Sequence, residues 1–206
     1  MRYVYLHGFA SSPFSRKAQA CAAAFSSREI ILEIPALDGG DFEHLTISGQ
    51  LDTLEDTLQN QPSCLIGSSM GGYLAALYAS RHPETVRLCL LAPAFNFLPR
   101  WLARADPKGT WRSSGWLPVY HYGDKCNRRL HYGLIEDARN YPATPDFCHP
   151  ALILHGLGDE TVPIAESRGF VASHPNAVLR EMDSDHELAS VLTEVVERAM
   201  AFVCST

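Results

Sequence analysis

The stretch Cys64–Ala76, CLIGSSMGGYLAA, joins a short apolar run to helix-forming residues through two adjacent serines. The apolar run is typical of a buried strand, and the residues after the serines favour a helix. Between the two, Gly67, Ser69 and Gly71 fit the pattern G-x-S-x-G, which places a serine on a sharp strand-to-helix turn. Side chains at the two glycine positions would collide in that turn. The stretch therefore predicts a strand, a tight turn that exposes Ser69, and a helix.

The neighbouring residues receive different roles. Ser68 lacks the flanking glycines of the pattern, and we expect it to take no part in the chemistry. A helix that begins near Met70 would direct its free N–H groups and its positive end toward a reacting carbonyl. In this kind of turn the N–H of the residue after the nucleophile binds the oxyanion, so Met70 is predicted to supply one donor.

Other apolar runs alternate with longer amphipathic segments along the chain. Continuously apolar strands separated by helices predict a doubly wound α/β fold, with a mostly parallel sheet of about six strands covered on both faces. The predicted strands are 2–6, 30–34, 63–66, 86–91, 151–155 and 178–182, and the predicted helices are 15–25, 44–58, 70–81, 164–173 and 187–204.

The segment from about residue 94 to residue 150 interrupts this alternation and contains no convincing strand. An unstructured connection of this length is improbable inside a compact domain. We therefore expect an inserted, partly helical cap between the fourth and fifth strands, within a single domain that spans residues 1–206. Its aromatic residues either line an acyl pocket or form the core of the cap: Phe95, Phe97, Trp101, Trp111, Trp116 and Tyr120.

A serine hydroxyl needs a neighbouring base, and in this architecture the partners follow in the order acid, then histidine. Asp159 lies after the fifth predicted strand in LILHGLGDETVP, and His186 after the sixth in REMDSDHELAS. Both loops leave the carboxyl edge of the sheet, as does the loop of Ser69. We predict that His186 takes the serine proton and that Asp159 orients His186. Asp183 is a second candidate for the acid, while Asp185 is too close in sequence to reach the far ring nitrogen.

The first predicted strand ends in YVYLHGFASSP, and its loop should lie beside the serine turn. In this fold the second oxyanion donor comes from that loop. The N–H of Phe9 is the favoured donor, although the dipeptide His7–Gly8 taken alone also fits a simple turn.

Composition excludes several classes of function. The 206 residues are 46% hydrophobic and 19% charged, with a net charge of −6, so no basic surface for nucleic acid or for anionic membranes is expected. No apolar run approaches the roughly 18 residues of a membrane span. The first residues do not resemble a signal peptide, and the six cysteines show no CxxC, so a cytoplasmic protein is predicted. No metal or cofactor is expected, because the candidate ligands in the cap fit no zinc spacing: His121, Asp124, Cys126 and His131.

Several of these segments together resemble one family. The run HGFASSPFSRKA, residues 7–18, is similar to the HGF-x-SSP-x-S-x-KA opening of the small bacterial YqiA-type esterases of the α/β-hydrolase superfamily. The GSSMGGY turn and the GDE-x-VP and DHEL segments are similar to their nucleophile, acid and base loops. The resemblance implies a carboxylesterase or thioesterase that needs no cofactor and lacks the first antiparallel strands of the superfamily. It does not extend to the cap.

The sequence thus predicts a serine hydrolase that cleaves small or medium acyl esters through a Ser69–His186–Asp159 triad and an acyl-enzyme. A thioesterase that acts on acyl-CoA or acyl-protein would use the same residues. A binding module of the same fold, without catalysis, is the third possibility.

Overall fold

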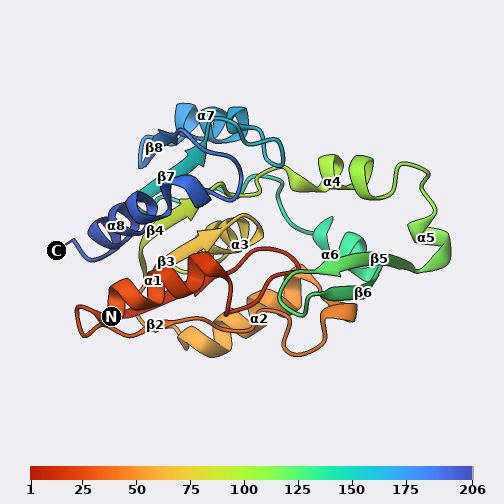
Figure 1. Cartoon of the computed structure of the whole chain (residues 1–206), viewed down its shortest axis with the longest axis horizontal. Coiled ribbons are helices and arrows are strands. Elements are labelled where there is room, and N and C mark those ends of the chain that lie inside the picture. The colour runs from red at the N-terminus through yellow and green to blue at the C-terminus, as the bar shows by residue number, and fades with distance from the viewer. Residues whose placement is uncertain (206) are drawn as a thin grey trace.

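Six parallel strands form the central sheet, in the order β2-β1-β3-β4-β7-β8 (Figure 1). The computed structural model describes residues 1–205. The strands are β1 (Arg2–Leu6), β2 (Leu32–Glu33), β3 (Ser63–Ser68), β4 (Thr85–Leu91), β7 (Ala151–Gly156) and β8 (Ala177–Met182). The predicted α/β class and the six-stranded sheet are confirmed.

Helices cover both faces of this sheet and create two separate cores. Alternate strand residues point to opposite faces, so Val4 and Leu6 join one core while Tyr5 joins the other. Helices α1 (Arg16–Ser26) and α8 (Leu192–Val203) pack on the face of Tyr5. The opposite face carries α2 (Ile47–Leu58), α3 (Met70–Ala79) and α7 (Ile164–Ser173).

The strand order reverses at β1, which lies between β2 and β3. The loops that follow β1 and β3 therefore leave the carboxyl end of the sheet side by side. Open α/β sheets bind ligands at such a switch point, so the topology alone directs attention to these two loops.

The segment between β4 and β7 forms the predicted insertion. Figure 1 shows it beyond the carboxyl ends of the strands. It contains α4 (Phe97–Ala105), α5 (Trp111–Ser114), β5 (Trp116–His121), β6 (Cys126–His131) and α6 (Gly133–Ala138). Its partly helical character was predicted correctly.

The expectation of no strand in the cap was wrong, because β5 and β6 pair as an antiparallel hairpin. Two features hide the hairpin in the sequence. Strand β6 is mostly polar, and β5 contains Pro118, which lacks the N–H of a strand interior. The two strands pair only with each other in the described part of the chain, so each has a free edge where a proline is tolerated.

Two predicted helices begin later than expected. Thr46 caps α2 by accepting a hydrogen bond from the N–H of Gly49, and a short 3₁₀ turn (η1, Phe42–His44) precedes it. Before α8, Leu188 adopts a left-handed conformation with φ 54°, which separates the His186 loop from the helix. His186 consequently lies on the loop between β8 and α8, where the sequence placed it.

Candidate active site

The turn between β3 and α3 holds Ser69 in a conformation that few non-glycine residues adopt. Its φ is 53° and its ψ is −114°. The end of β4 fixes this conformation: the N–H of Ser69 donates to Leu91 O at 2.8 Å, and Ser69 O accepts from the N–H of Ala94 at 3.0 Å. Strain held by surrounding bonds is common at functional sites.

The glycines on either side of Ser69 are required by close backbone contacts. A Cβ at Gly67 would clash with the backbone of Gly71 and Gly72, and a Cβ at Gly71 would clash with the carbonyl oxygens of Leu6 and His7. The turn is therefore pressed against the end of β1.

The structure brings Ser69, His186 and Asp159 into contact although they come from three separate loops. His186 Nε2 is 3.1 Å from Ser69 Oγ, and His186 Nδ1 is 2.7 Å from Asp159 Oδ2. Ser69 occupies the N-cap position of α3, yet its hydroxyl caps no backbone N–H. The hydroxyl is therefore available to the imidazole, and the imidazole is oriented by a carboxylate.

Asp159 is held as a carboxylate by several donors. Its side chain is fully buried, and Oδ1 accepts the N–H groups of Thr161 and Val162, each at 2.8 Å. Burial would raise the pKa of Asp159, but the hydrogen bonds from His155, His186 and Val162 outweigh it and keep the pKa well below its ordinary value. A permanently ionised carboxylate stabilises an imidazolium beside it.

The residues considered as alternatives lie elsewhere. Asp185 Oδ1 accepts the N–H of Glu187, as expected for a turn residue, and Asp159 rather than Asp183 contacts the histidine ring. Ser68 is 4% exposed, whereas Ser69 is partly exposed.

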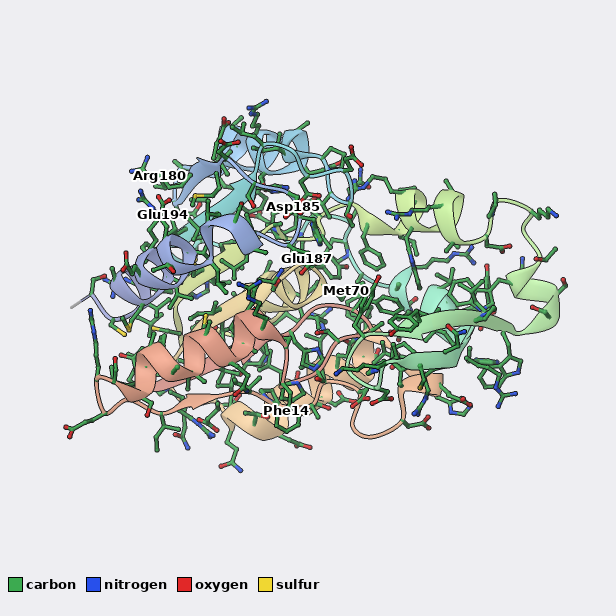
Figure 2. The ribbon with its side chains drawn as sticks, viewed as in Figure 1. Phe14, Met70, Arg180, Asp185, Glu187 and Glu194 are labelled. Atoms are coloured by element: carbon green, nitrogen blue, oxygen red, sulfur yellow. The ribbon has the colours of Figure 1, made fainter. Side chains whose placement is uncertain are left out.

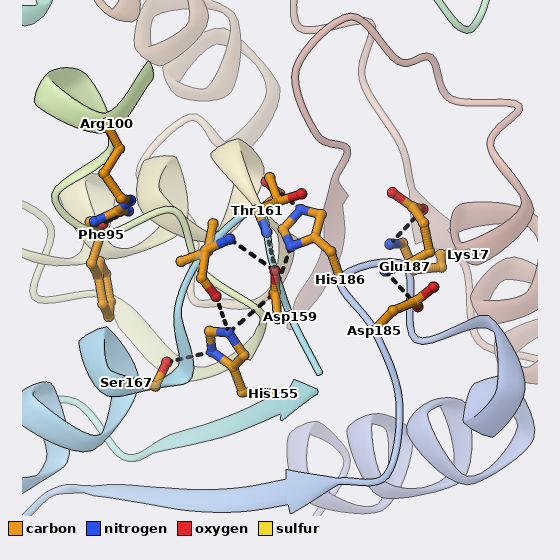
Figure 3. Close-up of polar contacts among 12 residues, drawn as sticks. Lys17, Phe95, Arg100, His155, Asp159, Thr161, Ser167, Asp185, His186 and Glu187 are labelled. Carbon is orange, nitrogen blue, oxygen red and sulfur yellow. Dashed lines mark hydrogen bonds and ion pairs between the residues drawn. The ribbon is translucent and has the colours of Figure 1, made fainter. Parts of the chain in front are cut away.

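A second histidine, which is not among the predicted site residues, also contacts Asp159. His155 Nε2 is 3.1 Å from Asp159 Oδ2, and its Nδ1 is 2.7 Å from Ser167 Oγ (Figure 3). Ser167 and His155 are both completely buried, so this second serine–histidine pair has no access for a substrate. The available signal was the position of His155, at the end of β7 and four residues before Asp159.

The loop after β1 lies against the serine turn. A Cβ on Gly8 would lie 3.5 Å from Ser69 Cβ. His7 Nδ1 donates to Gly8 O at 3.0 Å, and its Nε2 accepts the N–H of Leu37 at 3.4 Å. Burial lowers the pKa of His7 despite its bond to Gly8 O, which favours this neutral form. Because C=O and N–H point in opposite directions across a trans peptide, the N–H of Phe9 is directed away from the His7 ring.

The cap reaches the site through Trp101. The ring of Trp101, which is partly exposed, lies edge-on to that of Phe9 with 4.9 Å between centroids. Met70 lies near the border between the sheet and the cap (Figure 2). Most of the other cap aromatics belong to the core: Phe95, Phe97 and Trp111 are at most 8% exposed, whereas Tyr120 is 47% exposed and Trp116 is partly exposed.

Three properties of residues 1–205 bear on other functions. No group of three or more His, Cys, Asp or Glu within them is placed to hold a metal ion. None of their helices has the length and apolar character needed to cross a bilayer. The six cysteines are free thiols.

Comparison with known proteins gives a family and a fold. Residues 2–204 match the sequence model of the family described as "Uncharacterised protein family (UPF0227)". The mitochondrial palmitoyl-protein thioesterase ABHD10 of Pongo abelii is 30% identical over 169 residues, which are 73% of this chain and 53% of that protein. The chain thus spans about half the length of this curated relative.

Two solved structures share the fold. The structure of α/β hydrolase domain-containing protein 10 from mouse superposes with a TM-score of 0.80, at 19% identity, over 98% of this chain and 88% of that chain. Est1E from Butyrivibrio proteoclasticus, with ferulic acid bound, gives a TM-score of 0.79 at 21% identity, over 97% and 86% of the respective chains. The architecture is that of an α/β hydrolase, as expected from the resemblance noted above.

Proposed function

The chain belongs to the uncharacterised protein family UPF0227, and from this premise we propose that it is a serine hydrolase that cleaves small or medium acyl esters. The observation that carries the proposal is the continuous contact from Ser69 Oγ through the His186 ring to the buried Asp159 carboxylate. A partly exposed serine, a base within hydrogen-bond distance and an oriented tautomer are the requirements for an activated nucleophile.

The first half of the reaction forms an acyl-enzyme. Ser69 Oγ attacks the acyl carbon while His186 Nε2 accepts the hydroxyl proton. The carbonyl oxygen becomes an oxyanion that accepts hydrogen bonds from the N–H groups of Met70 and Phe9. The C–O bond to the leaving group then breaks, and His186 returns the proton to the departing alcohol.

The second half releases the acid. A water molecule gives a proton to His186 and attacks the acyl carbon, and the oxyanion forms again in the same place. Its collapse breaks the bond to Ser69, and His186 returns the proton to the serine. Asp159 stays ionised throughout and stabilises the imidazolium, so the cycle requires no metal or cofactor.

A phosphonate probe tests the proposal directly. We expect a fluorophosphonate to label Ser69 stoichiometrically, as mapped by mass spectrometry of the peptide that contains both serines. Ser69→Ala should lose labelling and at least about 10³-fold in kcat, the magnitude seen when the nucleophile of a triad is removed. Ser68→Ala is the matched control and should retain both the labelling and the wild-type kcat. Labelling of Ser68, or full activity in Ser69→Ala, contradicts the assignment.

A thiol leaving group is the second candidate, and the name of the curated relative, a palmitoyl-protein thioesterase, favours it. The same residues would perform both reactions, because a thiolate is a better leaving group than an alkoxide. Rates on an oxygen ester and on its thioester with the same acyl group distinguish the two. A kcat/KM for the thioester at least about tenfold higher, equivalent to roughly 1.4 kcal/mol in the barrier, would identify a thioesterase.

A further inference from the structure

We propose that His155 is a positioning residue for the triad: its ring holds the Asp159 carboxylate in the orientation that contacts His186. The inference rests on the proposed function and extends the site beyond the residues named there. Figure 3 shows the Asp159 carboxylate between the two imidazole rings, with Ser167 on the far side of His155.

The hydrogen bonds of His155 fix its tautomer. Nε2 faces two acceptors, Val162 O at 2.9 Å and Asp159 Oδ2 at 3.1 Å, so this nitrogen must carry a proton. Nδ1 lies 2.7 Å from Ser167 Oγ, whose hydroxyl can donate to it. Ser167 thus holds the ring in the tautomer that donates to Asp159. A carboxylate that accepts the second ring N–H of a metal-bound histidine sets that histidine's tautomer in the same way.

Asp159 Oδ2 is consequently shared by two imidazoles. His155 contacts it at 3.1 Å and His186 at 2.7 Å, while Oδ1 is occupied by two backbone N–H groups. With four donors placed around it, the carboxylate cannot rotate without losing bonds in a fully buried site. An unmade hydrogen bond of a buried charged group is costly, so this arrangement defines a single orientation for Oδ2.

The second consequence concerns the base. A donor on Oδ2 withdraws electron density from the oxygen that stabilises the His186 imidazolium. Removal of His155 should therefore let Oδ2 stabilise the imidazolium more strongly, and the acid limb of kcat/KM should move to higher pH. The other charged side chains in or near the His186 loop are Asp183, Asp185, Glu187 and Lys17, the last two paired at 3.1 Å. The contacts of His155 are instead with Asp159, Val162 and Ser167.

Two variants distinguish the effect of losing the hydrogen-bond donor from the effect of losing the volume of the ring. His155→Leu removes the donor, whereas His155→Gln can place an N–H close to the original Nε2. We expect His155→Leu to lower kcat by about 10- to 100-fold and to move the acid limb of kcat/KM upward by about one pH unit. His155→Gln should recover most of the rate and return the limb toward the wild-type position.

A readout independent of activity uses histidine labelled with ¹⁵N. The spectrum of the wild-type protein at pH 8 should show His155 as the Nε2–H tautomer, and titration of the His186 signal should show the same upward shift in His155→Leu. The two signals are assigned from the spectra of His155→Gln and His186→Asn. If Ser69 is not labelled by the phosphonate but the His186 shift is present, the proposed function fails and the positioning role stands.

Phe170→Leu supplies the control for simple destabilisation. Phe170 lies on α7 one turn from Ser167 and packs on Phe95, Phe147 and His174 rather than on Asp159. This variant should lower the melting temperature without moving the pH profile. An unchanged or lower His186 pKa in His155→Leu, or no recovery in His155→Gln, would overturn the proposal.

Discussion

At the scale of single residues, the site depends on places where a side chain cannot fit. Gly71 is the clearest example, because a Cβ there would meet the carbonyl oxygens of both Leu6 and His7. Those oxygens belong to the end of β1 and its loop, and neither can retreat without opening the sheet. The serine turn and the loop after β1 are therefore held in one fixed relation.

Gly71→Ala should consequently be destabilising by about 2 kcal/mol, as expected for overpacking against rigid backbone. It should also lower kcat, because a backbone shift that relieves the clash would move Ser69 away from His186. Gly169→Ala is the matched control: Gly169 lies in α7, and a Cβ added there would meet no atom within 4 Å, so alanine should be neutral or stabilise by up to about 1 kcal/mol. Urea unfolding of the two variants measures the contrast, and equal midpoints would refute the steric argument.

Sequence reasoning predicted which side chains meet at the candidate site where local geometry or loop order dictates their identity. Ser69 follows from its flanking glycines, and Asp159 and His186 follow from their places after successive strands. His155 could not be assigned in this way. Its contact with Ser167 on α7 depends on how that helix packs against β7, and no spacing in the chain encodes the packing.

At the scale of elements, the cap contacts the loop after β1 through Trp101. Its buried aromatics fill its own interior: Trp111 donates its indole N–H to Leu130 O, and Phe97 packs on Tyr73. Trp101 is the cap aromatic that combines partial exposure with contact to Phe9. Most of these residues therefore form core, and the lining of an acyl pocket stays a prediction for Trp101.

We expect short acyl chains to be preferred, because little of the aromatic surface of the cap remains free. In a series of p-nitrophenyl esters, kcat/KM should fall from acetate and butyrate to octanoate. Trp101→Ala should relax this preference by about 3- to 10-fold in favour of octanoate, the effect of roughly one side chain's apolar contact. Trp116→Ala is the control, since Trp116 packs on His44, His131 and Arg129. Faster turnover of octanoate than of acetate by the wild-type protein would contradict the expectation.

The elements themselves were predictable to different degrees. The inner strands β3, β4 and β7 could be located because they are largely apolar, which follows from burial on both faces, whereas the edge strands β2 and β8 are only partly buried. The β5–β6 hairpin could not, because an exposed two-stranded ribbon needs few apolar residues. Its pairing is stabilised by contacts across the chain, such as the bond from the Tyr122 N–H to Ala10 O at 2.7 Å.

At the scale of the whole molecule, the remaining question is whether sheet and cap form one cooperative unit. We propose that residues 1–206 are a single domain, with the insertion at about 94–150 as part of it. Aromatic contacts across the boundary support the proposal: Phe9 with Trp101, Tyr73 with Phe97, and Phe95 with Phe170. Interfaces that continue a core of this kind are expected to unfold together with it.

The distribution of tryptophan makes this testable without any mutation. All three tryptophans lie between residues 101 and 116, so their fluorescence reports the cap, whereas far-ultraviolet circular dichroism reports mainly the helices and strands of the sheet domain. A single domain predicts urea transitions with the same midpoint and the same slope for the two probes. Addition of the phosphonate, which would bond to Ser69 in the sheet domain, should leave the transitions coincident. A fluorescence midpoint at clearly lower urea would mean that the cap unfolds on its own, and the cap would then be a separate unit that opens over an intact triad.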